Sequence, residues 1–174
     1  MNIKIRCVTS DDAPAISAIY RPYVEQTAIS YEYTAPDAAE IGRRISETVK
    51  KYPYFVAECD GEVTGYAYAG AFKSRKAYEC SAEVSIYVKE GSHKRGIGRM
   101  LYEALENALK EQGITNMYAC IAVPEEEDEY LNFNSMRFHE HMGFRLAGTF
   151  SKCACKFGRW YGMIWMEKMI AEHT

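Results

Sequence analysis

The sequence predicts an α/β (α+β) fold in which seven strands and four helices form one domain over residues 1–174. Three segments carry this prediction. Residues 82–113 have the pattern of a strand, a basic glycine-containing loop and an amphipathic helix. Residues 54–70 contain two apolar segments joined by Asp-Gly, which is typical of a β-hairpin. Residues 116–123 are almost continuously apolar, which favours a buried central strand.

The composition narrows the class of protein. The chain is 48% hydrophobic and 26% charged, as in soluble globular proteins. A net charge of −3 and a pI near 5.9 argue against a general nucleic-acid binder. The N-terminus has no apolar signal region, and no segment approaches the ~20 apolar residues of a membrane span. We therefore expect no nucleic-acid or membrane partner and a cytoplasmic location.

The six cysteines suggest neither a disulfide framework nor a metal site. No two of them form a CxxC motif, and their spacing fits no zinc template. We expect reduced thiols and no metal ion. The cysteines are at positions 7, 59, 80, 120, 153 and 155.

The elements of the N-terminal part follow from short patterns. Residues 3–8 alternate and predict a first strand. Thr9 and Asp12 have the spacing of a capping box at the start of a helix. The aromatic segment 27–36 ends in proline and predicts an ordered loop, and a second helix is expected from about residue 37.

The C-terminal part predicts one helix and two strands. Residues 124–130 form an acidic loop, for which a solvated insertion is the simplest interpretation. A helix is expected from about Asn132 to Met142, ended by Gly143. Strands are expected at about 144–155 and 160–169.

The loop at residues 93–99, HKRGIGR, predicts a phosphate site. It precedes a helix N-terminus, where unpaired amides and the helix dipole favour an anion. Gly96 and Gly98 allow close approach of the backbone, and three nearby cations add charge. The loop is neither a Walker A motif nor G-x-G-x-x-G. A basic loop before an ordinary helix is the alternative.

These residues resemble a known family. The loop is similar to the pyrophosphate loop of the GCN5-related N-acetyltransferases (GNAT), whose pattern falls here on His93, Gly96 and Gly98. The element order is also that of the GNAT fold, which implies a mixed, mostly antiparallel central sheet of about seven strands flanked by four helices. More narrowly, the chain resembles the phosphinothricin/methionine sulfone acetyltransferase branch. The matching segments are 30–33, 70–75, 82–88, 95–99, 132–144 and 156–160.

The resemblance implies acetyl-CoA as the cofactor, with CoA as product. The backbone of Ile86, Tyr87 and Val88 would hold the pantetheine arm, with an amide near Val88 facing the thioester oxygen. Asn132 and Ser135 match the family's Asn-x-x-Ser, although Asn132 is equally interpretable as a helix cap. The phosphates would be bound by His93, Lys94, Arg95, Gly96, Ile97, Gly98 and Arg99.

Two residues are candidates for catalysis. A carboxylate inside an apolar strand must be solvent-facing, paired or functional, and Glu83 matches the family's catalytic glutamate. We expect Glu83 to remove a proton from the attacking amine, directly or through a water. His139 stands where many relatives have a tyrosine that protonates the leaving sulfur. It is either a general acid or substrate-site group, or a surface or core histidine.

For the acceptor, the resemblance implies a small-molecule amine, bound by Tyr31, Tyr33, Phe72 and Arg75. Arg75 would pair with a carboxylate, and the aromatic residues would line an apolar slot. Alternatively, the cations near Arg75 form a solvated charge run. The branch is commonly dimeric, and the aromatic segment 160–166 would suit either the core or a homodimer interface.

The predicted reaction is direct acetyl transfer to the amino group of an amino acid or analogue in a ternary complex. A polyamine, an aminoglycoside or a protein N-terminus is the alternative acceptor. For a polycation, the acidic residues at 125–129 would provide the binding charge. The alternative in which the protein is not an enzyme is a CoA-binding regulatory module without turnover.

Overall fold

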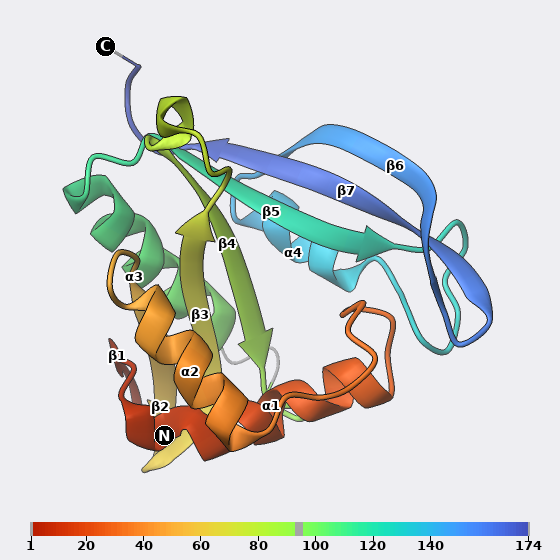
Figure 1. Cartoon of the computed structure of the whole chain (residues 1–174), viewed down its shortest axis with the longest axis horizontal. Helices are drawn as coiled ribbons and strands as arrows, with labels where there is room; N and C mark the ends of the chain where they lie inside the picture. The colour runs from red at the N-terminus through yellow and green to blue at the C-terminus, as the bar shows by residue number, and fades with distance from the viewer. Residues whose placement is uncertain (1, 93–95, 174) are drawn as a thin grey trace.

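The computed structural model of the chain describes residues 2–92 and 96–173. Within these residues, seven strands form one sheet in the order β1-β2-β3-β4-β5-β7-β6 (Figure 1). β4 and β5 are parallel, and the other neighbouring strands are antiparallel. The strands are β1 (Ile3–Cys7), β2 (Tyr54–Cys59), β3 (Glu62–Ala71), β4 (Ser81–Val88), β5 (Asn116–Val123), β6 (Arg145–Lys156) and β7 (Arg159–Met169).

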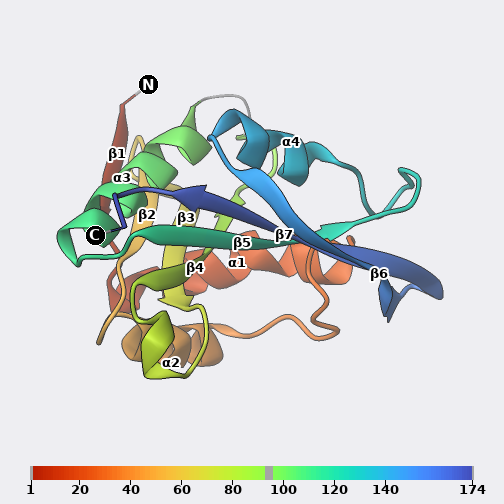
Figure 2. The ribbon, with the colours of Figure 1, turned by 90° about the horizontal axis from the view of Figure 1, so that it is seen from above.

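Four α-helices cover the two faces of the sheet. Figure 2 shows α1 and α2 on one side and α3 and α4 on the other. None of the helices in the described residues is both long and apolar enough to cross a membrane. The helices are α1 (Ala13–Glu25), α2 (Ala38–Thr48), α3 (Ile97–Glu111) and α4 (Asn134–His141), with short 3₁₀ helices at Ser10–Asp12 and Lys76–Tyr78.

Strand alternation divides the core into two layers. On β4, Val84 packs into the cluster beneath α3, which contains Leu101 and Leu105. The next residues on the opposite face, including Tyr87, pack toward α1 and α2. The predicted fold class and element order are therefore confirmed, and the polar face of β4 that carries Glu83 lies on the side of α1 and α2.

The two predicted helix caps have different outcomes in the structure. The capping box is present, because the Thr9 amide donates to the Asp12 carboxylate over 2.8 Å. The last helix, however, has Phe133 rather than Asn132 at its N-cap. The Asn132 side chain instead accepts a hydrogen bond from the Asn134 amide over 2.9 Å, which is an Asx turn just before the helix.

Candidate active site

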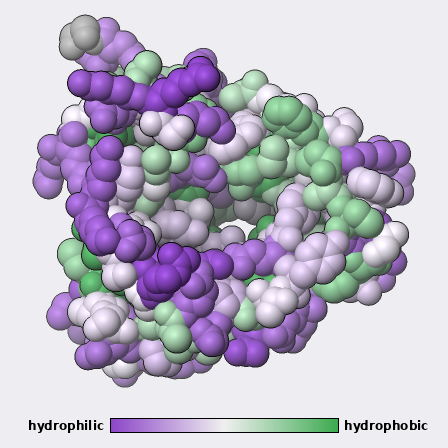
Figure 3. Space-filling view, viewed as in Figure 1, coloured by the Kyte–Doolittle hydropathy of each residue, from purple (hydrophilic) through white to green (hydrophobic). Residues whose placement is uncertain are grey.

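The central feature of the site is the separation of β4 from β5. The two strands pair only from Ser81 to Glu83, opposite Asn116 to Tyr118. Beyond Glu83 they diverge (Figure 1). Figure 3 shows the molecule hollowed at the middle of this face. A molecule entering the gap would therefore meet the free edge of β4 and the side chain of Glu83.

The free edge of β4 has backbone groups that point into the gap. The Lys89 amide donates to the Thr64 carbonyl on the β3 side over 2.8 Å. In an antiparallel ladder, alternate residues point their amides to the same neighbour. The amides of Ile86 and Val88 therefore point away from β3, toward the gap. The carbonyl of Val88 accepts the Tyr23 hydroxyl over 2.5 Å, which ties the end of β4 to α1.

Glu83 lies where the strands separate. It is half-buried and faces Gly70 on β3 and Tyr118 on β5. A Cβ atom at Gly70 would meet no heavy atom within 4 Å, so the space beside Glu83 is open. Burial raises the pKa of Glu83, and the nearby charge of Lys73 opposes this effect. A carboxylate with a raised pKa beside an open space is suited to accept a proton.

An aromatic and cationic wall lies next to Glu83. Phe72 stacks on Tyr118 with ring centroids 4.1 Å apart and contacts Trp165 edge to face. The Lys73 ammonium lies over both the Phe72 and Trp165 rings, at 5.0 and 5.2 Å. Arg75 is exposed and forms no salt bridge to any of the described residues. Phe72 thus belongs to an aromatic cluster with Tyr118, the residue opposite Glu83 on β5, whereas the binding role of Arg75 stays a prediction.

Tyr31 and Tyr33 use their hydroxyls to hold the loop between α1 and α2. Tyr31 donates to the carbonyl of Gly162 over 2.5 Å, and Tyr33 donates to the carbonyl of Cys155. The Tyr33 side chain is 73% exposed, so it does not line the apolar slot that we expected. Both tyrosines attach the loop to the β6–β7 hairpin.

The start of α3 is the predicted phosphate site. Gly96 is the N-cap residue and has φ +79°, a conformation that favours glycine. At position 98, glycine is needed for a reason other than the expected close approach of the backbone to an anion. A Cβ atom added there would lie 3.0 Å from the Phe138 ring, so glycine allows α3 and α4 to pack closely. The Ile97 side chain is in the core, and Arg99 faces a cavity of about 420 Å³ between α3 and α4. His93, Lys94 and Arg95 lie outside the described residues.

His139 is in the core and not in the gap. Its side chain is 3% exposed and packs against Tyr102, Phe138 and Phe144. Its Nδ1 lies 2.7 Å from the Ser135 carbonyl and its Nε2 lies 2.8 Å from the Tyr102 hydroxyl. Nδ1 therefore carries the proton, and Nε2 accepts from Tyr102. Burial lowers the pKa of His139 to about 4. These contacts favour the interpretation as a core histidine.

The acidic loop at 125–129 is partly neutralised by three local cations. Arg159 pairs with Asp128 and with both carboxylate oxygens of Glu129, at 2.7–2.9 Å. Glu125 pairs with Lys152, and Glu127 pairs with Arg137. Three cations therefore offset three of the five negative charges at 125–129, which reduces the charge available to bind a polycation.

Comparisons with known proteins connect this geometry to a family. Residues 5–165 match the model of the acetyltransferase (GNAT) domain. The chain belongs to the GNAT acetyltransferase family. A phosphinothricin N-acetyltransferase from Alcaligenes faecalis is 34% identical, over 94% of this chain and 81% of that protein. An L-methionine sulfoximine/L-methionine sulfone acetyltransferase from Pseudomonas aeruginosa is 31% identical, over 96% of this chain and 94% of that protein.

A solved structure gives the same result. The phosphinothricin acetyltransferase of Sinorhizobium meliloti in complex with acetyl-CoA matches with a TM-score of 0.87 and 33% identity, over 97% of this chain and 89% of that chain. The predicted GNAT fold, N-acetyltransferase activity and acetyl-CoA cofactor are confirmed. The open edge of β4 and the start of α3 fit an extended molecule that ends in phosphates.

The structure also gathers residues on the Glu83 face of the sheet that the sequence prediction did not assign to any site. They are mostly tyrosines on the Glu83 face of the sheet, together with one ion pair between the α1–α2 loop and α2. The available signal was the period of two along each strand. Tyr66 and Tyr68 share one face of β3, and Glu83, Ser85 and Tyr87 share one face of β4. The residues that the prediction did not name are Tyr20, Glu32, Arg44, Tyr54, Tyr66 and Tyr68, and they gather beside the side chain of Tyr87, which was expected to contribute only its backbone.

Proposed function

We propose that this chain acetylates the α-amino group of an amino acid or close analogue, by direct attack in a ternary complex. The observation that carries the proposal is Glu83, a half-buried carboxylate with a raised pKa, at the point where β4 and β5 separate. The relatives named as phosphinothricin and methionine sulfone acetyltransferases support an amino acid analogue as acceptor.

Each step of the reaction has a candidate residue. Glu83 accepts the proton of the acceptor's ammonium group, directly or through a water, and so makes the amine nucleophilic. When bound, acetyl-CoA would supply the thioester carbon: a C–N bond to the amine would form, the C–S bond would break, and the second proton of the amine would pass to the departing thiolate. The Val88 amide, which points away from β3, would donate to the oxyanion. Arg75, which is exposed, would pair with the acceptor's carboxylate.

A covalent acetyl-enzyme is disfavoured. Cys120 is the cysteine whose pKa is affected by Glu83, and it lies on β5 next to the gap. Surrounding protein atoms and the charge of Glu83 raise the pKa of Cys120 to about 11. The thiol therefore stays protonated at neutral pH and is a poor nucleophile.

Release of free thiol from acetyl-CoA tests the proposal. Methionine sulfone, methionine sulfoximine, phosphinothricin and the common amino acids should be compared with a polyamine, an aminoglycoside and a peptide N-terminus. We expect turnover with amino acid acceptors, and a large loss in Glu83→Gln. Acetyl-CoA binding without turnover on any amine would instead support the regulatory module.

The proposal includes a homodimer and a cytoplasmic location. β6 is an edge strand that carries exposed Leu146 and Phe150, and exposed Trp160 lies opposite it on β7. A long exposed edge with apolar side chains is suited to pairing with a second copy. The six free cysteines support a reducing compartment.

A further inference from the structure

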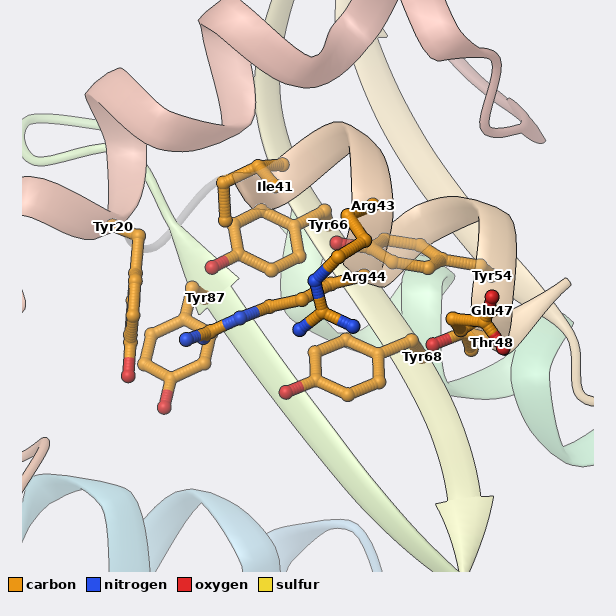
Figure 4. Close-up of a pocket in the computed structure, with 10 residues that line it drawn as sticks. All are labelled: Tyr20, Ile41, Arg43, Arg44, Glu47, Thr48, Tyr54, Tyr66, Tyr68 and Tyr87. Atoms are coloured by element: carbon orange, nitrogen blue, oxygen red, sulfur yellow. The ribbon is translucent and has the colours of Figure 1, made fainter. Parts of the chain in front are cut away.

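A cavity of about 260 Å³ lies between α2 and the sheet, on the same face as Glu83 (Figure 4). None of the residues expected to bind the acceptor lines it. Its floor consists of tyrosines from β2, β3 and β4, its roof of α2, and its end wall of Tyr20 from α1. The lining residues are Tyr20, Ile41, Arg43, Arg44, Glu47, Thr48, Tyr54, Tyr66, Tyr68 and Tyr87.

The walls are aromatic, yet they present unused hydroxyls. Tyr54 stacks on Tyr68 at 4.9 Å, and the Tyr66 and Tyr68 rings are nearly parallel. No residue in 2–92 or 96–173 hydrogen-bonds to the hydroxyl of Tyr54 or Tyr66, and no buried side-chain polar atom of these residues lacks a partner, so both hydroxyls reach the open volume of the cavity. Because a hydroxyl that faces open space has no protein acceptor, these two can donate to a guest that accepts hydrogen bonds.

The cavity has no spare charge. Arg44, which reaches across it toward Tyr20 and Tyr87 in Figure 4, donates to both oxygens of Glu32, at 2.8 and 3.1 Å, and to Glu40 at 2.8 Å. Glu32 also accepts the Tyr20 hydroxyl over 3.0 Å. An anionic guest would meet a guanidinium that is already neutralised.

The strand register connects the cavity to Glu83. Tyr66, Tyr68 and Gly70 share one face of β3, opposite Tyr87, Ser85 and Glu83 on β4. Glu83 is therefore two residues along β4, about 7 Å, from the Tyr68–Ser85 pair at the cavity. The charges of Glu83, Glu32 and Arg44 all act on the Tyr68 hydroxyl, and the space at Gly70 is open.

We infer that this tyrosine cavity holds the side chain of the acceptor and selects uncharged side chains that carry hydrogen-bond-accepting oxygens. The inference rests on the proposed function. The amino group lies at Glu83 while the side chain extends along the tyrosine face, where ring faces pack on its carbon atoms and hydroxyls donate to its oxygens. Glu32 disfavours anionic side chains relative to neutral ones, because it keeps Arg44 neutralised.

A charge change at Glu32 tests this selection. Glu32→Gln keeps the size and most hydrogen bonds but leaves Arg44 with excess positive charge. We expect the ratio of kcat/KM for phosphinothricin, with its anionic phosphinate, to that for methionine sulfone to rise about tenfold. Glu129→Gln is the matched control, because Glu129 also pairs with both nitrogens of an arginine but lies outside the cavity. It should leave the ratio unchanged.

Tyr66→Phe provides a second variant that should fold normally, since its hydroxyl has no partner in the described protein. We expect kcat/KM for methionine sulfone to fall about threefold to tenfold and that for alanine, whose side chain is too short to fill the cavity, to stay the same. Wild-type turnover with an unchanged ratio in Glu32→Gln and unchanged kinetics in Tyr66→Phe would overturn the cavity's role but leave the activity intact. Absence of wild-type turnover on every amine would overturn the proposed function itself.

Discussion

The ammonium group of Lys156 lies 2.6 Å from the carbonyl oxygen of Ser30. It also donates to the carbonyls of Val24, at 2.7 Å, and Thr27, at 2.9 Å, and the residue is only 2% exposed. One cation from the end of β6 therefore binds the C-terminus of α1 and the loop that carries Glu32. The acceptor side of the site depends on a contact between segments more than 100 residues apart.

Replacing Lys156 should loosen this loop. Lys156→Met leaves three carbonyls without their donor, and we expect a loss of about 2–3 kcal/mol in the free energy of unfolding. The KM for the acceptor should rise, while the KM for acetyl-CoA stays near the wild-type value. Urea unfolding and steady-state kinetics measure both effects. Lys152→Met, which removes an exposed lysine of the same strand, is the control.

Replacing Glu83 should remove the base. Glu83→Gln should lower kcat by about 10²–10⁴ at neutral pH, because a positioned general base contributes this much. The mutant should also lose the acid limb of the wild-type pH profile. A kcat within a factor of two of wild type at every pH would exclude Glu83 as the base.

The charge of Lys73 should set the position of that acid limb. Lys73 opposes the burial that raises the pKa of Glu83. In Lys73→Met the carboxylate loses this stabilisation, its pKa rises further, and the acid limb of kcat/KM should move to higher pH. Lys76→Met, on the following 3₁₀ helix, is the comparison. A shift toward lower pH would contradict the arrangement described.

His139 should affect stability rather than turnover. Its pKa falls from 6.5 to about 4 on folding, so between these values the unfolded chain binds a proton that the folded protein does not. Its stabilising contribution is complete above pH 6.5 and is lost as the pH falls toward 4, by about 3 kcal/mol. Denaturant unfolding from pH 4 to 7.5 should show a smaller slope in His139→Gln than in wild type.

Turnover separates the two interpretations of His139. As a core residue it takes no part in proton transfer, so folded His139→Gln should keep the wild-type pH profile of kcat. His141→Gln is the control, because His141 is an exposed histidine of the same helix. A large fall in kcat without loss of stability would restore the general acid.

Charge on the β6 edge should separate the two subunits of the proposed dimer. Leu146→Glu with Trp160→Glu places carboxylates on the exposed apolar surface. We expect the mass measured by light scattering to fall from two chains to one. Phe157→Glu, an exposed aromatic in the turn between β6 and β7, tests whether the interface extends to the tip. Wild-type protein with the mass of one chain would exclude the dimer.

Local patterns were sufficient for most of the fold. Alternation, the Asp-Gly turn and the helix stop at Gly143 depend on neighbours within a few residues, and the structure has these elements close to the predicted bounds. Glu83 was also recognisable, since a carboxylate in an apolar strand is conspicuous without knowledge of its neighbours. The local role of Asn132 was harder to recognise, because an Asx turn and a helix cap use the same residue type.

The sequence by itself determined the order of the elements, the GNAT family and the candidate base. These depend on local periodicity and on short motifs. Only the tertiary structure decided that His139 is buried, that Tyr31 and Tyr33 anchor a loop, and that Glu32 and Arg44 neutralise each other beside a tyrosine cavity. The physical reason is that burial and pairing of a polar side chain depend on groups that distant segments bring to it.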